Sequence, residues 1–234
     1  MSARPKPLVI AIDGPSGSGK SSVSRAVAQR LKLAYLDTGA MYRALTWWCT
    51  QTEVDLEDLP AVARAARDLP LQMVTDPDSP SVRVGGQAID EAIRTSEISE
   101  SVSKVATNLE VRAELLVRQR ALIAQSVEND GGVVVEGRDI TTVVAPGADV
   151  RILLMASQNA RLTRRAKELH GHSDDAAVGA THDQIVRRDA DDSTVSEFME
   201  AAPGVTLVDT SDLDFDQAVD AVLVVVDSRT GQQR

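Results

Sequence analysis

The fold is decided by the stretch Gly14-Pro15-Ser16-Gly17-Ser18-Gly19-Lys20-Ser21, which matches the phosphate-loop pattern G-x-x-x-x-G-K-[ST] in full. The apolar run at 8–13 precedes it and predicts a short buried strand. The segment 20–31 follows it, and Val23 and Val27 lie four residues apart there, as on one face of a helix. This order of strand, glycine-rich turn and helix is the context that a phosphate loop requires.

Each residue type in this loop has a task in binding a nucleoside triphosphate. The glycines let successive backbone N–H groups point at phosphate oxygens, and the helix adds the positive end of its dipole. Lys20 supplies a point charge to the β- and γ-phosphates, and the Ser21 hydroxyl is the candidate ligand of a Mg²⁺ cofactor. The residues predicted to bind ATP are Gly14, Pro15, Ser16, Gly17, Ser18, Gly19, Lys20, Ser21 and Ser22.

Composition narrows the class of protein. The 234 residues include 35 acidic and 25 basic side chains, a net charge of −10, which disfavours general binding to nucleic acid or a membrane surface. The single cysteine, Cys49, excludes a disulfide framework and a cysteine-based zinc site. No run approaches 18 apolar residues, and the run before Asp13 is too short for a signal peptide. We therefore expect a cytoplasmic protein and, because nothing in the sequence requires a partner chain, a monomer.

Beyond the loop, strand-like and helix-like segments alternate, which predicts an α/β fold with a parallel sheet flanked by helices. Further strands are predicted at 35–37, 132–136, 150–155 and 205–208. Helices are predicted at 40–49, 56–68, 97–107, 109–127, 160–169, 183–200 with a break near Asp192, and 214–226.

Three regions carry more detailed expectations. The segment 69–95 places short alternating runs between prolines and glycines, which predicts a small antiparallel sheet inserted in the domain. Residues 170–181 lack periodicity and predict a mobile loop, and the tail from Ser228 is expected to fray. The helix at 109–127 is expected to bury the face formed by Leu109, Ala113, Leu116, Ile123 and Val127.

A second candidate anion site lies in the segment 36–43, Leu-Asp-Thr-Gly-Ala-Met-Tyr-Arg. Asp37 and Thr38 can cap the helix that follows, and Arg43 lies one turn inside that helix. Two explanations stay open: a binding site for a second anion, or plain helix capping beside a solvated arginine.

The predicted strand at 132–136 ends in Glu136-Gly137-Arg138-Asp139. Arg138 therefore lies at the carboxyl edge of the sheet, where open α/β folds bind ligands. A cation at this edge suits a second anionic substrate better than a hydrolytic water. Four carboxylates are candidates to organise the waters of Mg²⁺ or the substrate: Asp13, Asp37, Glu136 and Asp139.

Arginines account for 20 of the 25 basic residues, which fits either one anion pocket or codon bias with surface ion pairs. The further candidate cations are Arg112, Arg138, Arg161, Arg164, Arg165, Arg187 and Arg188. The segment 161–188 has arginines on both sides of a loop, which fits a lid that covers the triphosphate and excludes water. The spacing of Arg161, Arg164 and Arg165 equally fits ordinary pairing on a helix surface.

Taken together, these motifs resemble the bacterial cytidylate kinase family. The resemblance covers the phosphate loop, Leu-Asp-Thr-Gly-Ala-Met-Tyr-Arg, Glu-Gly-Arg-Asp and Arg-Arg-Asp-x-x-Asp-Ser, and so spans residues 13–193. It implies an enzyme that transfers phosphate from ATP to CMP and dCMP with Mg²⁺. It also implies three parts: a core at about 6–55, 97–160 and 203–227, an insert for the nucleoside monophosphate at about 56–96, and a lid at about 161–200.

The resemblance also assigns residues to the acceptor, CMP. It implies that Thr38 lies near CMP, that Arg43 and Arg138 bind its phosphate, and that Asp139 reaches its sugar. Ser103 and Arg112 resemble the family's pair at the cytosine ring, and Asp192 resembles the acid that binds the ribose hydroxyl. Arg188 resembles the lid arginine that approaches the phosphates. The residues expected to act in catalysis are Lys20, Arg138 and Arg188.

One departure from the family pattern and two other functions remain open. Many members carry an arginine where this chain has Val195, which puts one sugar or phosphate contact in doubt. A kinase for another small acceptor shares the same loop, as does a regulatory protein that hydrolyses ATP slowly. The arginines favour a phosphorylated acceptor, and the absence of interaction tails or basic stripes counts against a regulatory protein.

Overall fold

The structure is a computed structural model that describes residues 7–170, 174, 179, 182, 186–187 and 189–231, with the backbone alone at 168–170. The central strands are β1 (Leu8–Asp13), β2 (Ala34–Asp37), β6 (Gly132–Gly137), β7 (Val150–Met155) and β8 (Thr206–Asp209). The insert holds β3 (Leu71–Val74), β4 (Ser81–Val84), β5 (Gln87–Ala88) and the 3₁₀ turn η1 (Ala92–Arg94). The α-helices are α1 (Lys20–Leu31), α2 (Thr38–Gln51), α3 (Leu59–Asp68), α4 (Ser96–Ala106), α5 (Leu109–Asp130), α6 (Gln158–His170) and α8 (Phe215–Thr230), and a π turn, η2, spans Ile140–Val144.

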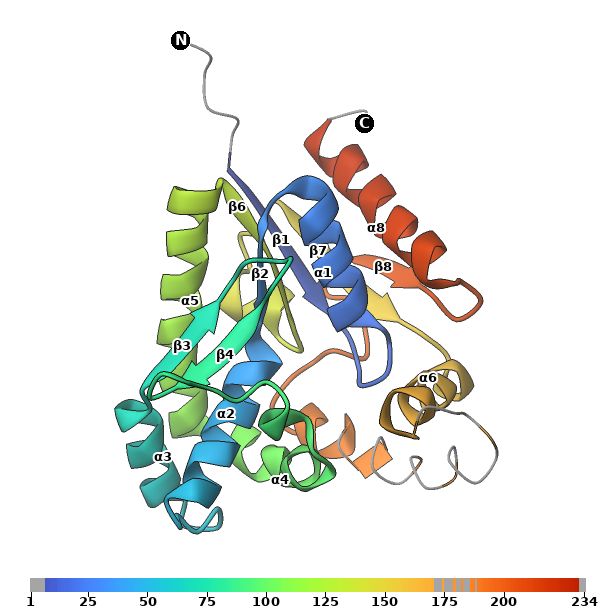
Figure 1. The fold of residues 1–234 in the computed structure, drawn as a ribbon. Helices are drawn as coiled ribbons and strands as arrows, with labels where there is room; N and C mark the ends of the chain where they lie inside the picture. Colours follow the sequence, from blue (N-terminus) through green and yellow to red (C-terminus); the bar gives the residue numbers. More distant parts are fainter. Residues whose placement is uncertain are drawn as a thin grey trace.

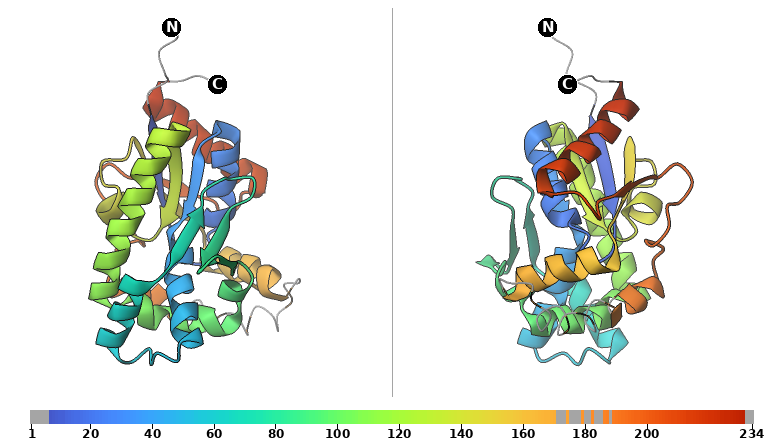
Figure 2. Two further views of the ribbon diagram at one scale, coloured as in Figure 1. Left: turned by 60° about the vertical axis from the view of Figure 1, so that its left-hand side comes forward. Right: turned by 90° about the vertical axis from the view of Figure 1, so that its right-hand side faces the viewer.

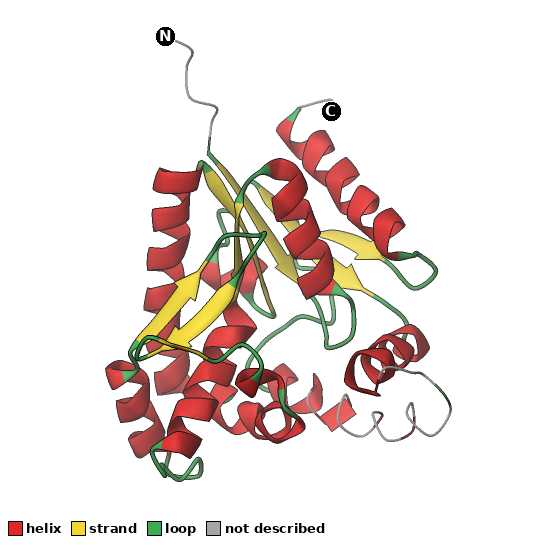
Figure 3. Cartoon of the chain, in the orientation of Figure 1, coloured by secondary structure: helices red, strands yellow, loops and turns green. Residues whose placement is uncertain are grey.

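The central strands form one parallel sheet in the order β2-β6-β1-β7-β8 (Figure 1). Side chains alternate between its two faces, as the twofold period of a strand requires. Ile10 and Ile12 pack with α1 and α8, whereas Ala11 packs in the cluster on the opposite face. Helices lie on both faces, as Figures 2 and 3 show, which is typical of parallel sheets. The predicted parallel α/β fold is confirmed.

The predicted antiparallel insert is also confirmed: β3, β4 and β5 form a separate sheet. Its turn between β3 and β4 is fastened to the central fold. Arg25 of α1 donates from Nε to the Pro77 carbonyl and from its terminal nitrogen to the Asp78 carbonyl, both at 2.7 Å. The Tyr35 N–H at the edge of the central sheet donates to the Thr75 carbonyl at 2.8 Å. These bonds hold the turn against both α1 and β2.

Helix capping explains why several boundaries differ from the expected ones. The Asp37 side chain accepts from the Ala40 N–H at 2.8 Å, so α2 begins two residues earlier than expected. Asp58 caps α3 in the same way, so that helix begins at Leu59 rather than at 56. The expected fraying from Ser228 is wrong as far as Gly231, because α8 continues to Thr230 and ends at this left-handed glycine, while 232–234 lie outside the described residues.

The buried face predicted for α5 is wrong at Leu109 and Ala113, which are exposed, whereas Leu116 and Ile123 are half-buried and pack against the core. Leu109, the first residue of the helix after the Asn108 cap, is 71% exposed. The buried residues are Val111, Leu115, Gln119 and Ser126. Gln119 hydrogen-bonds to Tyr42, so its polar side chain is satisfied in the interior. A stripe that includes Gln119 and Ser126 is not recognised from hydrophobic spacing alone.

The lid segment is described only in part. The predicted helix at 160–169 is confirmed as α6, but most of the loop at 170–181 and Arg188 lie outside the described residues. The expected helix at 183–200 is wrong beyond Ser193, since 194–200 are non-helical. None of the helices in the described part of the chain combines the length and apolarity that a membrane span needs.

Candidate active site

The phosphate loop joins β1 to α1 in a conformation that glycine makes possible. Gly17 and Gly19 have φ angles of 76° and 86°, in the left-handed region that most residues avoid. A Cβ on Gly14 would lie 2.3 Å from the Leu154 carbonyl oxygen of the neighbouring strand, so only glycine fits there. Lys20 begins α1 and donates from Nζ to the Pro15 carbonyl at 3.5 Å. The residues predicted to bind ATP thus form one continuous loop and helix start.

Three of the cavities in the described part of the chain adjoin this loop. The first, of 170 Å³, is lined by loop residues and by cations from four other parts of the chain: Arg43, Arg94, Arg138 and Arg165. The second, of 420 Å³, lies beside the start of α8 and is lined by Arg164, Thr210 and Phe215 together with Gly17 to Gly19 of the loop. Such a concentration of cations around backbone N–H groups suits a polyphosphate.

Ser21 and Glu136 form the part of the site that fits a metal ion. The Ser21 hydroxyl donates to Glu136 Oε1 at 2.6 Å, and the Tyr35 hydroxyl donates to the same oxygen at 3.3 Å. Glu136 is the last residue but one of β6 and is buried, and its burial together with the charge of Asp37 raises its pKa to about 7. A hydroxyl and a carboxylate beside a phosphate loop are the hard oxygen donors that Mg²⁺ takes, so these residues fit the expected cofactor.

A third cavity, of 70 Å³, adjoins the phosphate loop where α1 begins. It shares Lys20 and Ser21 with the loop and is lined by residues from β2, α2, α4, α5 and the end of β6. The predicted acceptor residues that line it are Thr38, Arg43, Arg112, Arg138, Asp139 and Asp192. Ser103 is not among the lining residues: it is buried in α4, and Val102 and Ala106 of that helix face the cavity instead.

Arg43 is held in place by Asp37. Their side chains are 2.7 Å apart and both are largely buried. Burial acts to raise the pKa of Asp37, but the Arg43 guanidinium and further cations outweigh it and hold that pKa below its ordinary value. The Arg43 Nε is buried and has no hydrogen-bond partner within the described part of the chain. A buried donor of this kind is costly unless a ligand accepts from it.

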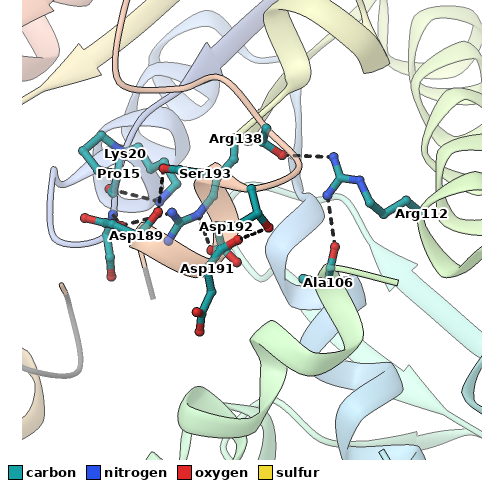
Figure 4. Close-up of polar contacts among 12 residues, drawn as sticks. Pro15, Lys20, Ala106, Arg112, Arg138, Asp189, Asp191, Asp192 and Ser193 are labelled. Atoms are coloured by element: carbon teal, nitrogen blue, oxygen red, sulfur yellow. Dashed lines mark hydrogen bonds and ion pairs between the residues drawn. The ribbon is translucent and has the colours of Figure 1, made fainter. Parts of the chain in front are cut away.

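Arg112 and Arg138 are also paired with carboxylates. Arg112 donates to Asp139 at 2.5 Å, to the Ser196 hydroxyl at 3.0 Å and to the Ala106 carbonyl at 3.2 Å. Arg138 Nε lies 2.9 Å from Asp192 Oδ2. Figure 4 shows Arg138 and Arg112 reaching their partners from opposite sides of the site. Arg43, Arg112 and Arg138 thus line the third cavity, and an acidic side chain orients each of these three guanidinium groups.

Asp189 is a functional candidate that the sequence analysis did not single out. It lies beside Arg138 in Figure 4 and accepts from that arginine at 3.0 Å. It also accepts from the Ser16 N–H of the phosphate loop at 3.2 Å and from Arg161. A backbone N–H and two guanidinium groups are the donors that a phosphate oxygen also takes. The motif Arg-Arg-Asp-x-x-Asp-Ser contains Asp189, but its pattern drew attention to Asp192. Arg94 was missed as well, because it lies in the insert and no motif marks it.

The remaining predicted residues have other contacts. Arg161 is buried and Arg164 donates to the Thr210 and Leu213 carbonyls at 2.5 and 3.2 Å, so surface pairing does not describe these two arginines. Arg187 is exposed, and Arg188 lies outside the described residues. Asp13 lines none of the three cavities described above. Its carboxylate oxygens instead accept hydrogen bonds from the π turn η2.

Comparison with known proteins gives one consistent result. A family model described as cytidylate kinase matches residues 10–228. The cytidylate kinase of Streptomyces avermitilis is 46% identical over 224 residues, which cover 95% of this chain and 94% of that protein. That of Cutibacterium acnes is 48% identical over 221 residues, covering 94% and 96%. That of Rhodococcus jostii is 48% identical over 229 residues, covering 96% of each.

Proposed function

Because this chain belongs to the cytidylate kinase family, we propose that it transfers the γ-phosphoryl group of ATP to CMP and dCMP, giving ADP with CDP or dCDP. One observation carries the proposal: Lys20 and Ser21 line the polyphosphate cavity and the acceptor cavity alike. A donor phosphate at the loop and an acceptor phosphate beside Arg43 would therefore meet at the same lysine. The unpartnered Nε of Arg43 supports an anionic acceptor in that cavity.

The chemistry needs positioning and charge neutralisation more than proton transfer. An oxygen of the acceptor phosphate forms the new bond to the γ-phosphorus while the bond to the β–γ bridging oxygen breaks. Lys20 is assigned to the donor phosphates, and Arg138 to the charge shared between donor and acceptor. The acceptor phosphate is already a nucleophile near neutral pH, so no general base is required. Fixed cations supply stabilisation without having to reorganise.

The acceptor is assigned to the residues around the third cavity. Arg43 and Arg138 are proposed to bind its phosphate, and Asp139 and Asp192 its sugar. Thr38 and Arg112 complete the proposed lining, with Arg112 at the base, whereas Ser103 is buried in α4 and does not line this cavity. Arg138 also lies over the Phe198 ring, 4.4 Å from its centroid, which fixes the guanidinium plane.

Mg²⁺ is proposed to bind at Ser21, with Glu136 close enough to hold its waters. When bound, the ion neutralises charge on the donor phosphates. Ser21 and Glu136 present their oxygens without it, because the hydrogen bond between them already aligns both side chains.

We propose that the chain divides its work between the core, an insert at about 56–96 that holds the acceptor, and a lid at about 161–200. Arg161 and Asp189 belong to the proposed lid, and their contacts with Ser16 tie it to the phosphate loop. A lid in this place would exclude water and so limit hydrolysis of ATP. We also propose a cytoplasmic monomer with no nucleic-acid or membrane partner, in keeping with the net charge of −10.

The experiment that tests this function measures ATP consumption with Mg²⁺ against CMP, dCMP, UMP, AMP and no acceptor. We expect turnover with CMP and dCMP. Turnover with UMP or AMP alone would replace CMP as the acceptor. Equal turnover with and without an acceptor would favour a regulatory ATPase. Lys20→Met is expected to remove most turnover while CMP still binds, measured by calorimetry. An equal loss of CMP affinity in a folded variant would contradict the assignment of Lys20 to the donor.

A further inference from the structure

Asp13 lies directly before the phosphate loop in sequence, yet its hydrogen bonds lead elsewhere. It ends β1 and is only 1% exposed. Its Oδ1 accepts from the Ile140 N–H at 2.8 Å. Its Oδ2 accepts from the Thr141 N–H at 2.8 Å and from the Thr141 hydroxyl at 2.6 Å. Both oxygens thus hold the segment that follows Arg138 and Asp139.

The segment that Asp13 holds is η2, a π-helical segment of five residues. Within it, the Val143 and Val144 N–H groups both donate to the Asp139 carbonyl, at 2.8 and 3.1 Å. The first N–H groups of a helical turn have no partner inside the turn and must find one outside. Asp13 supplies that partner from another strand, with a charged acceptor that makes such bonds stronger. The π-helix is rare in proteins, and its single turns are frequently found at functional sites.

The same stretch of chain is fixed on its other side by Thr38. The Thr38 hydroxyl donates to the Glu136 carbonyl at 2.8 Å. Gly137 fits so closely beneath it that a Cβ there would lie 2.5 Å from Thr38 Oγ1 and 2.8 Å from the Ile140 side chain. Arg138 and Asp139 are therefore the only two residues between this fixed point and the turn that Asp13 caps.

We propose that Asp13 is a positioning residue of the acceptor site: by holding Ile140 and Thr141, it directs Arg138 and Asp139 into the acceptor cavity. This inference rests on the acceptor site proposed above. The position of Asp13 in the sequence suggests a role at the phosphate loop that binds ATP, whereas its hydrogen bonds suggest a role at the site that binds CMP. The first role predicts a change in KM for ATP and the second a change in KM for CMP, so kinetics can distinguish them.

The test replaces Asp13 with a side chain of the same shape. Asp13→Asn keeps the volume but exchanges one acceptor oxygen for an NH₂ group, so a bond to the π turn is lost. We expect KM for CMP to rise roughly tenfold, the size of a lost hydrogen bond to a charged group. We expect KM for ATP to stay within about twofold, because the donor cavity is lined by other residues. Arg138→Ala is measured beside it as a direct test of the acceptor site.

Two conservative variants of Thr141 test the same hydrogen bond in case Asp13→Asn does not fold. Thr141→Val keeps the shape and removes only the hydroxyl that donates to Asp13. Thr141→Ser keeps that hydroxyl and is the rescue control. We expect KM for CMP to rise a few-fold in the valine variant and to return to the original value in the serine variant.

The outcomes distinguish a failure of this inference from a failure of the proposed acceptor site. If Arg138→Ala raises KM for CMP but neither Asp13→Asn nor Thr141→Val does, the acceptor site stands and the inference falls. If the Asp13 variant raises KM for ATP instead, Asp13 serves the donor loop and the inference is overturned. If Arg138→Ala also leaves KM for CMP unchanged, both the acceptor site and the inference fall.

Discussion

Glu136→Gln is expected to make the protein without substrates more stable at neutral and alkaline pH. Glu136 is 1% exposed, and burial together with the charge of Asp37 raises its pKa from 4.5 to about 7. The folded state therefore holds this proton more tightly than the unfolded chain does. The resulting contribution to stability is complete below about pH 4.5 and is lost as the pH rises through 7.

The size of the effect follows from the shift in pKa. One pKa unit corresponds to about 1.4 kcal/mol, so the full rise from 4.5 to about 7 is on the order of 3 kcal/mol. Burial also raises the pKa of Asp13, to about 6, so Asp13 adds a slope of the same sign that extends above pH 6. The difference between the original chain and the Glu136→Gln variant therefore isolates Glu136. Between pH 6 and 7, the contribution of Glu136 to the free energy of unfolding should fall by roughly 1 kcal/mol per pH unit.

The assay is urea unfolding between pH 5 and 8 in the absence of nucleotide and Mg²⁺. Between pH 6 and 7, the Glu136→Gln variant should show a clearly smaller slope than the original chain, because only the contribution of Asp13 remains. At pH 8 it should be the more stable of the two. Glu128→Gln removes an exposed carboxylate of α5 and should keep the original slope. If a folded Glu136→Gln variant keeps the same slope between pH 6 and 7, the buried glutamate does not titrate there and the reasoning is refuted.

Three further predictions concern the loop and the lid. Gly14→Ala should destabilise the protein by about 1–3 kcal/mol and suppress turnover, because its Cβ would meet a backbone carbonyl at 2.3 Å. Gly147→Ala is the control: its Cβ would meet no atom within 4 Å, so this variant should be neutral in thermal unfolding. Asp189→Asn should weaken the contacts that join Arg138 to the phosphate loop and lower kcat several-fold; an unchanged kcat would deny Asp189 any part in the site. Val195→Arg should lower KM for CMP up to roughly tenfold and change the ratio of CMP to dCMP turnover, as expected for a gained charged hydrogen bond; identical ratios would exclude a sugar or phosphate contact at this position.

Local patterns in the sequence were enough to predict the fold and the phosphate loop. The loop is contiguous, and its glycines, lysine and serine act through the backbone that they themselves form. The alternation of strands and helices likewise fixes a parallel sheet, and with it the edge where Arg138 lies. Thr38, Arg43 and Arg112 line the acceptor cavity as the family motifs imply, although contact with CMP stays a prediction.

What the sequence could not supply depends on contacts between distant residues. Asp189 joins Ser16, which is 173 positions away, and no local pattern encodes that distance. Asp13 adjoins the phosphate loop in sequence, but its partners Ile140 and Thr141 are more than 120 positions away. The buried stripe of α5 was missed for a related reason, since Gln119 becomes an interior residue only because Tyr42 packs against it.

The fastening of the β3–β4 turn decides where this protein can be labelled. Arg25 and Gln29 of α1 both bind the Pro77 carbonyl, so a dye or an inserted peptide in that turn would disturb the helix that begins with Lys20. The next turn, at Gly85 and Gly86, is exposed, and a Cβ at either glycine would meet no atom within 4 Å. Both glycines have positive φ angles, so the probe is better attached at the exposed Gln87 beside them. A fluorophore there would report on the insert while leaving its attachment to α1 intact.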